Sequence, residues 1–178
     1  GGDFTSYNSQ SANRIARVIA TNSGNASIDA QNGGFDGGFN IGLGADSFVS
    51  SVAVYRSGAN LDKIVLGGGF TSFNGQSRNR IARLNTDGSL DGAFSPGAGF
   101  NGTVRSVAIQ AADGKVIVGG SFTEFNGQSR TNIARLNADG SVDTTFNPVG
   151  GANGTVYAVA VDGAGKVLIG GDFTEYSG

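Results

Sequence analysis

The sequence predicts an all-β protein built from repeated, four-stranded antiparallel sheets. The phrase Gly-Gly-x-Phe-Thr occurs four times, and its phenylalanines are 66, 52 and 51 residues apart. Each unit contains short apolar segments separated by turn signals, and no segment has helical periodicity. Four short strands in a unit of this length are typical of the blade of a β-propeller.

The repeat is clearest in the middle of the chain. Residues 70–94 and 122–146 are identical at 18 of 25 positions. The first unit is longer, and we attribute the excess to loops by aligning Arg17 and Asp29 with Arg83 and Asp91 of the second unit. The additional residues between Arg17 and Phe39 are rich in Gly, Asn and Ser, which predicts extended and mobile surface loops.

Each unit has the same predicted order of strands. The first strand alternates small Ser or Ala with Val or Ile, and we expect it to be innermost because small side chains suit the narrow centre of a propeller. The second is almost wholly apolar, the third contains Ile-Ala-Arg, and the fourth ends at a Phe. In the third unit the first, second and fourth strands fall at residues 104–110, 115–120 and 142–146. The third strand carries Ile133 and ends in the Asp-Gly-Ser turn at Asp139.

The 178 residues form one repeat domain with about three blades' worth of strands. We divide it into a half-blade (1–46), two blades (47–99 and 100–154) and a complementary half-blade (155–178). Propellers usually need at least four blades to close, and bare strand edges are normally avoided. We therefore expect an incomplete propeller that is completed by self-association or by further repeats of a longer parent chain. Two copies would give six blades, three copies nine, and a rotation that does not close would give a fibre.

The composition excludes most catalytic and several binding functions. Cys, His, Met and Trp are absent, which removes thiol and imidazole catalysis, disulfides and ordinary zinc or copper sites. With 12 basic and 14 acidic side chains the chain lacks the basic face of a nucleic-acid binder. No apolar run is long enough to insert into a membrane. We therefore expect no catalytic residues, no metal and no cofactor. The first residue is Gly, which suggests a processed product or a piece of a longer chain.

Five short motifs recur in a fixed order along the chain. They are GG-x-F-T, FNGQSR, IARLN-x-DGS-x-D, F-x-P and DGK-V-x-x-GG. Together they resemble the bacterial delta-60 repeat, a kelch-like β-propeller repeat of large secreted and surface proteins. The first unit departs from the pattern, because Gly24-Asn25-Ala26 replaces the Asp-Gly of the turn before Ser27. The resemblance implies an exported bacterial setting and no agreed activity, so no active-site residue follows from it.

Repeated charged side chains have both a functional and a structural interpretation. The Arg of each third strand and the Asp of each Ser-x-Asp could form a ring of ligand-binding charges or ion pairs within each blade. Recurrence in every unit favours the ion pairs. Asp87, Ser89 and Asp91 resemble the start of a calcium loop, but no bidentate Glu follows, and a turn capped by Asp explains the same residues.

Repeated aromatic residues and Asn-Gly-Thr sequences also favour structural roles. The aromatic pairs could be sugar platforms, although the dominance of Phe favours packing between blades. Asn101 and Asn153 fit a glycosylation sequon, but they recur just before a strand, which favours a turn. The aromatic pairs are Phe4/Tyr7, Phe70/Phe73, Phe122/Phe125 and Phe173/Tyr176.

One polar loop is the candidate ligand-binding surface. It carries an Arg capable of bidentate hydrogen bonding and lies between two predicted strands. The alternative is that these arginines tie neighbouring blades together. In the first unit Ala12 replaces the Arg after Gln10 and Ser11. The candidate residues are Gln76, Ser77, Arg78, Gln128, Ser129 and Arg130.

Three functions remain open. The first is a non-catalytic propeller module of an exported or cell-surface bacterial protein, acting in adhesion or in protein or glycan binding. The second is a structural subunit of an extracellular fibre or phage-type appendage, assembled by completion of blades between chains. The third is a polysaccharide-acting enzyme, which is least supported because Glu124 and Glu175 occupy equivalent repeat positions.

Overall fold

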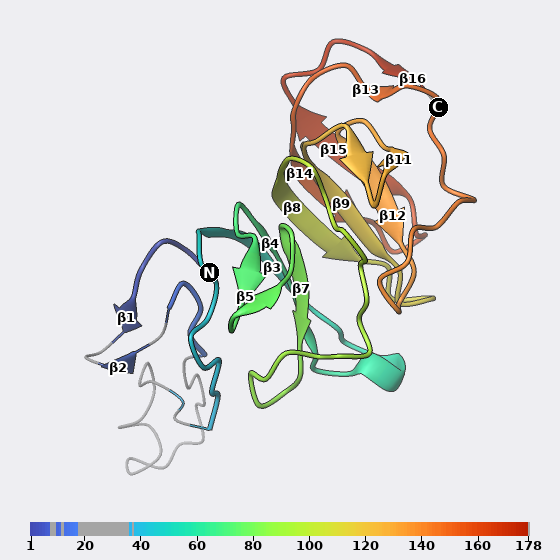
Figure 1. Cartoon of the computed structure of the whole chain (residues 1–178). Helices are drawn as coiled ribbons and strands as arrows, with labels where there is room; N and C mark the ends of the chain where they lie inside the picture. Colours follow the sequence, from blue (N-terminus) through green and yellow to red (C-terminus); the bar gives the residue numbers. More distant parts are fainter. Residues whose placement is uncertain (8–9, 12, 18–35, 37, 178) are drawn as a thin grey trace.

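The protein is an open series of small antiparallel sheets that follow one another along an arc (Figure 1). This computed structural model describes residues 1–7, 10–11, 13–17, 36 and 38–177. The arrangement is that of a partial β-propeller, and the described sheets do not close into a ring. The loop residues between 18 and 35, for which we expect mobility, lie outside the described residues.

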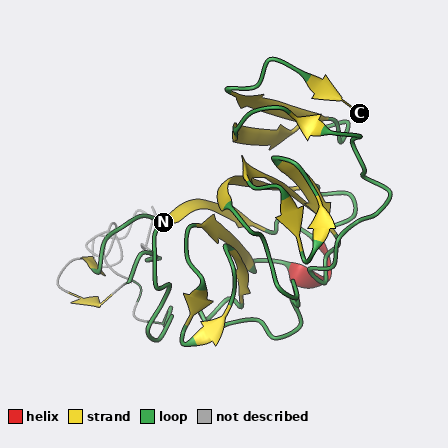
Figure 2. Ribbon diagram, turned by 45° about the horizontal axis from the view of Figure 1, so that its top comes forward, coloured by secondary structure: helices red, strands yellow, loops and turns green. Residues whose placement is uncertain are grey.

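Two sheets have three strands each, and their strand order follows the repeat. The first contains β3 (Val49–Val54), β4 (Ile64–Gly68) and β7 (Ile81–Leu84), in that order. The second contains β8 (Thr103–Ile109), β9 (Val116–Ser121) and β12 (Ile133–Leu136). The last sheet has only β14 (Val156–Val161) and β15 (Val167–Gly171). In Figure 2 it lies at the end of the series that carries the C-terminus.

Short hairpins connect the second and third strands. Their strands are β1 (Ser6–Tyr7) with β2 (Gln10–Ser11), β5 (Ser72–Phe73) with β6 (Gln76–Ser77), and β10 (Glu124–Phe125) with β11 (Gln128–Ser129). A further pair joins β13 (Gly151–Ala152) to β16 (Tyr176–Ser177). The one helical element among the described residues is a 3-10 turn, η1 (Gly58–Asn60), and no described helix could cross a membrane.

The predicted fourth strand is reduced to a single bridge in each complete sheet. Leu90 pairs with Leu84, and Val142 pairs with Leu136. The strand ends there because Asp91 closes a turn: its Oδ1 accepts from the Ala93 N–H at 2.9 Å. The turn brings Phe94 into the core, where it is fully buried.

The first strands lie where neighbouring sheets converge, which confirms the predicted strand order. β8 contacts both β3 and β14, whereas the third strands β7 and β12 make no comparable contact with each other. The small side chains also make hydrogen bonds between sheets. Ser51 Oγ accepts from the Val107 N–H at 3.0 Å, and Ser106 Oγ accepts from the Val159 N–H at 3.1 Å.

The core lies between sheets, where the same positions of the repeat come together each time. One cluster joins the N-terminal half-blade to the first complete sheet, and a second joins the two complete sheets. In the second cluster Phe100 packs on Phe122 and Phe125, with ring centroids 4.4 and 4.6 Å apart. The sheets approach closely at glycines. A Cβ on Gly119 would lie 2.6 Å from a methyl carbon of Val156.

This close approach predicts different effects for the same substitution in successive units. Gly119→Ala should lower the free energy of unfolding by about 1–3 kcal/mol, because the added methyl overpacks the interface. Gly170 has the same repeat position, but a Cβ there would meet nothing within 4 Å. In dilute solution Gly170→Ala should therefore change stability by less than about 0.5 kcal/mol. Urea unfolding of both variants measures the difference, and equal losses would contradict the packing described here.

Candidate functional site

The Gln-Ser-Arg segments lie on tight hairpins that project from the two complete sheets. Each hairpin turns at an Asn-Gly pair with both residues at positive φ: 50° and 73° at Asn74 and Gly75, 49° and 75° at Asn126 and Gly127. This is the type I′ turn that Asn-Gly favours. Gln76, Ser77, Gln128 and Ser129 are exposed as a result.

Arg78 and Arg130 adopt the same conformation in their two hairpins. The Nη1 of Arg78 donates to the Ser77 carbonyl at 2.7 Å, and that of Arg130 to the Ser129 carbonyl at 2.6 Å. The Nε of each is buried and has no acceptor among the described residues. No described hydrogen bond of either guanidinium reaches another sheet, so the structure gives no support to a tie between blades.

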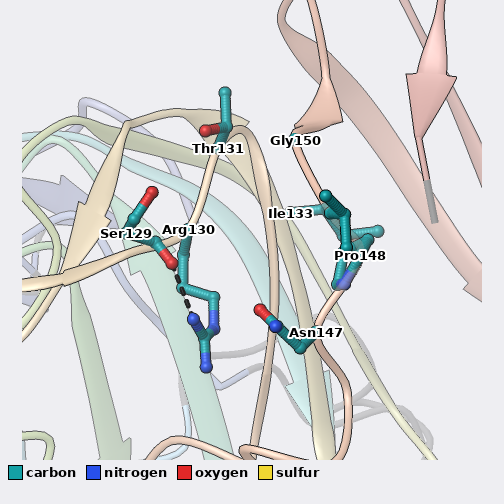
Figure 3. Close-up of a pocket in the computed structure, with 8 residues that line it drawn as sticks. Ser129, Arg130, Thr131, Ile133, Asn147, Pro148 and Gly150 are labelled. Atoms are coloured by element: carbon teal, nitrogen blue, oxygen red, sulfur yellow. Dashed lines mark hydrogen bonds between the residues drawn. The ribbon is translucent and has the colours of Figure 1, made fainter.

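A cavity of about 290 Å³ adjoins the second of these hairpins (Figure 3). Figure 3 shows the Arg130 guanidinium and the Asn147 amide beside each other at this cavity. Of the residues predicted from the sequence, only Ser129 and Arg130 line it. Gln128 does not, and Gln76, Ser77 and Arg78 belong to the other hairpin. The lining residues are Ser129, Arg130, Thr131, Ile133, Asn147, Pro148, Val149 and Gly150.

Asn147 and Pro148 are site residues that the sequence-based prediction missed. Their signal was the F-x-P motif, which recurs as Phe94-Ser95-Pro96 and Phe146-Asn147-Pro148. The lining combines a guanidinium, an amide and hydroxyls with the apolar faces of Ile133 and Pro148. Such a set can bind a carboxylate or a hydroxyl-rich molecule, and it offers no group that would exchange a proton near neutral pH.

The repeated Arg and Asp side chains form ion pairs within blades. Asp91 accepts from Arg83 Nε at 2.7 Å and from Lys63 Nζ at 2.9 Å. In the next blade Asp143 accepts from Arg135 Nε at 2.7 Å and from Lys115 Nζ at 2.8 Å. Arg83 also donates to the carbonyl of Ala138 in the following blade. These charges are therefore committed to the fold.

Arg17 has an ion-pair partner, Asp36, that the sequence analysis did not assign to it. Arg17 Nε donates to Asp36 Oδ2 at 2.7 Å, and Asp29 lies outside the described residues. Arg17 and Asp36 are 19 residues apart, compared with 8 for Arg83 and Asp91. All the additional residues therefore precede Asp36, whose position three before Phe39 matches that of Asp91 before Phe94.

The residues that resemble a calcium loop form capped turns. Asp87 Oδ1 accepts from both the N–H and the Oγ of Ser89, at 2.9 and 2.6 Å. Asp139 and Ser141 repeat this geometry. Across the part of the chain that the structure describes, no group of three or more Asp or Glu side chains is placed to hold a metal ion.

The Asn-Gly-Thr and aromatic repeats also have structural roles. Asn101 Nδ2 donates to Thr123 Oγ1 at 2.8 Å, and its Oδ1 accepts the N–H groups of Thr123 and Glu124. Asn153 makes the same three bonds with Thr174 and Glu175. The aromatic pairs of the second and third units are buried between blades: Phe70, Phe73, Phe122 and Phe125.

The lowered pKa values of two carboxylates predict that the free energy of unfolding falls only at acidic pH. Burial favours the protonated form of Asp46, but hydrogen bonds from Ser72 and Thr71 outweigh it and lower its pKa from 3.8 to about 2. Burial of Asp143 is likewise outweighed by Lys115, Thr145 and Arg135, so its pKa also lies below the ordinary range. Because these pKa values are lower in the folded state, the stability they give is present above pH 4 and is lost as pH falls towards 2.

The melting temperature should therefore be nearly constant from pH 5 to 7.5 and decline below about pH 4. The absence of His supports the flat region, because no imidazole titrates there. Thermal unfolding followed by circular dichroism at half-unit pH intervals measures this. A melting temperature that falls between pH 7 and 5, or that does not fall by pH 2.5, would contradict it.

The fold and its repeated interfaces define the class of protein as a β-propeller built from sequence repeats. Consistently, the sequence model of a family described as a domain of unknown function (DUF5122) beta-propeller matches residues 1–18, 62–94 and 111–146 of this chain. These three segments supply the repeated hairpins, third strands and Asp turns, and the match supports a β-propeller repeat family for this chain. No curated protein and no solved structure matches the sequence.

Proposed function

We propose that the chain is a non-catalytic binding module of an exported bacterial surface protein, built from delta-60-type repeats and acting in adhesion to a glycan or protein. The observation that carries the proposal is the pair of identical Gln-Ser-Arg hairpins, in which Arg78 and Arg130 are held by the same bond to their own backbone. The two hairpins belong to successive blades, and the rigid sheets fix the distance between them.

Repetition favours a ligand that is itself repetitive. Two equivalent loops on one rigid scaffold can bind successive units of a polymer, and the second contact is then intramolecular. The cavity beside Arg130 adds Asn147 and an apolar wall to one of the two hairpins. An acidic polysaccharide fits these features, because a guanidinium binds a carboxylate bidentately and the amide binds hydroxyl groups.

The state of the carboxylates supports a non-catalytic role. Asp91 and Asp143 are buried in ion pairs, and Asp87 and Asp139 cap turns. Glu124 and Glu175 are exposed at equivalent positions of separate repeats. The absence of Cys and Met from the sequence suits an extracellular location, since no side chain is readily oxidised.

The test is binding to an array of neutral and acidic polysaccharides, with protein in dilute solution. We expect an acidic polymer to bind, and Arg78→Ala/Arg130→Ala to weaken it at least about tenfold. Arg56→Ala is the matched control, because Arg56 is exposed and lies outside both hairpins. Binding that is equally reduced by Arg56→Ala, or that survives the double substitution, would contradict the proposal. Release of reducing ends from a bound polymer would instead favour a polysaccharide-acting enzyme.

The two-stranded last sheet favours a second candidate, the structural subunit of a fibre or appendage. β15 has a strand on one side only, whereas β4 and β9 are each flanked by two strands. In such an assembly the completion of this sheet by another chain would be the function itself.

A further inference from the structure

The cavity beside Arg130 lies where a hairpin stem faces the connection that leads to the next blade. This connection occurs three times, at residues 40–45, 95–100 and 147–152. In each copy a glycine N–H donates to the carbonyl three residues earlier, at 3.1, 3.1 and 3.2 Å, so all three contain the same tight turn. Differences between the three sites therefore come from side chains. The donating residues are Gly44, Gly99 and Gly151.

In the first two copies an asparagine amide of the hairpin stem is bonded to the connection. Thr131 has the same repeat position in the third copy. Its hydroxyl lies one bond closer to the backbone than an amide nitrogen, so it does not span the gap to the Gly150 carbonyl. Figure 3 shows Thr131 and Gly150 on the two sides of this opening. The amide bonds of the other copies run from Asn13 to Leu43 and from Asn79 to Ala98, both at 2.7 Å.

Two further side chains distinguish the third copy from the second. Asn147 replaces Ser95, and Val149 replaces Gly97. A Cβ at Gly97 would lie 2.6 Å from Asn126 Oδ1, so the second copy has no room for a side chain at this position. Val149, in contrast, lines the cavity and is 74 % exposed. The third copy therefore gains an amide and an apolar side chain that the second lacks.

Arg130 presents an unpaired edge of its guanidinium at this opening. Its Nη1 donates to the Ser129 carbonyl at 2.6 Å, which fixes the direction of the side chain. Its Nε is buried without an acceptor among the described residues. A buried donor without a partner is costly, and a carboxylate can accept from Nε and Nη2 at the same time. The Asn147 amide lies beside the guanidinium and can bond to a second polar group of the same ligand (Figure 3).

We propose that this cavity binds a single hexuronic acid residue, and that Thr131 is the residue that keeps the cavity open for it. The sugar carboxylate accepts from Arg130, its ring hydroxyls bond to the Asn147 amide, and the apolar face of the ring packs on Pro148. The cavity volume of about 290 Å³ is close to the lower limit of small-molecule sites, roughly 300 Å³, which suits one sugar ring. Such binding rests on the proposed function and names the sugar that its ligand must contain.

The two hairpins then bind the polymer in different ways. Arg78 has the same bond to its own hairpin as Arg130, from Nη1 to the Ser77 carbonyl at 2.7 Å. Beside it, however, the bond from Asn79 to the connection crosses the space that is open at the third copy. Arg78 can therefore contact a carboxylate of the polymer at the surface, whereas Arg130 holds a whole sugar ring. Both arginines should contribute to polymer binding, and only Arg130 to the binding of a free sugar.

Binding of free monosaccharides to the whole chain tests the proposal, with chemical-shift changes in NMR spectra as the measurement. We expect glucuronate or galacturonate to bind at least about tenfold more tightly than glucose or acetate, because neither of these has both a carboxylate and ring hydroxyls. Arg130→Ala should abolish uronate binding, and Arg78→Ala should leave it unchanged. Acetate that binds as tightly as the uronates would overturn the proposal, because a carboxylate of an acidic peptide would then fit equally well.

Thr131→Asn should weaken uronate binding at least about tenfold, because the new amide can bond to the Gly150 carbonyl as Asn79 bonds to that of Ala98. The matched control is Asn79→Thr, which makes the reverse change at the same position of the other hairpin and should not weaken uronate binding. Uronate binding that survives Thr131→Asn, or that Asn79→Thr weakens equally, would overturn the proposal. The melting temperature of each variant shows whether it is folded.

The result can be separated from that of the proposed function. An acidic polymer that binds through both arginines, without any binding of free uronate, would overturn the uronate site and leave the proposed function in place. If no acidic polymer binds, the proposed function itself fails. Uronate binding that requires Arg130 and the Thr131 side chain, together with polymer binding that requires both arginines, is the result that we expect.

Discussion

Arg83→Ala should lower the free energy of unfolding by about 3–5 kcal/mol, the usual effect of breaking a buried ion pair from one side. The Arg83 side chain is 2 % exposed and binds Asp91 at 2.7 Å, so its removal leaves a buried carboxylate with Lys63 as its one remaining ion-pair partner among the described residues. It also removes the bond to the Ala138 carbonyl, which joins two blades, and the contact with the Phe94 ring at 5.0 Å. Equilibrium unfolding in urea measures the loss.

Arg135→Ala is the matched control for this prediction. Arg135 makes the same ion pair with Asp143, but its side chain is 19 % exposed. Its remaining described hydrogen bonds go to Gln110 and Thr145, at 3.4 and 3.3 Å. The loss should therefore be clearly smaller than for Arg83→Ala. Equal losses would mean that the bond between blades contributes nothing, which contradicts the role given to Arg83.

Phe122→Ala should have a comparable effect, about 3–5 kcal/mol, because it opens a large cavity in a closed core. Phe122 is 2 % exposed and packs on Phe100 with ring centroids 4.4 Å apart. The neighbouring residues Val116 and Val118 are fully buried in strand β9 and cannot easily move to fill the space. Urea unfolding again gives the difference in stability.

Phe173→Ala removes the same side chain from the half-built interface. Phe173 already lines a cavity of about 290 Å³ at the last sheet, so in dilute solution its loss should cost less than half as much as that of Phe122. If Phe173→Ala is as costly as Phe122→Ala in a dilute monomer, the last interface is already complete within one chain.

The sequence was sufficient to predict the propeller class and the strand order, because both depend on patterns that recur. The small residues of the first strand correctly predicted that this strand lies where the sheets converge. The apolar segments that follow a Lys correctly predicted the second strand. The length of the fourth strand was overestimated. Its alternating residues satisfy the pattern of a strand, but Asp91 closes a turn after a single bridge, and this depends on a side-chain bond that hydrophobic patterning does not reveal.

The ion pair between Arg17 and Asp36 shows a limit of aligning motifs along a sequence. Asp29 follows a Ser-x pattern like that of Asp91, whereas Asp36 has the correct distance to the following Phe. Only the position of the Arg17 guanidinium distinguishes the two. Only part of the lining of the cavity beside Arg130 was predicted. Ser129 and Arg130 belong to one sequence motif, whereas Asn147 belongs to another motif that only the fold brings beside them.

The protection of β15 amides from hydrogen exchange tests most directly whether the last sheet is half-built. In dilute solution we expect the amides of β15 to exchange much faster than those of β4 and β9, which have a strand on each side. Full protection of β15 in a dilute, monomeric sample would contradict this expectation, because it would mean that the chain completes this sheet by itself.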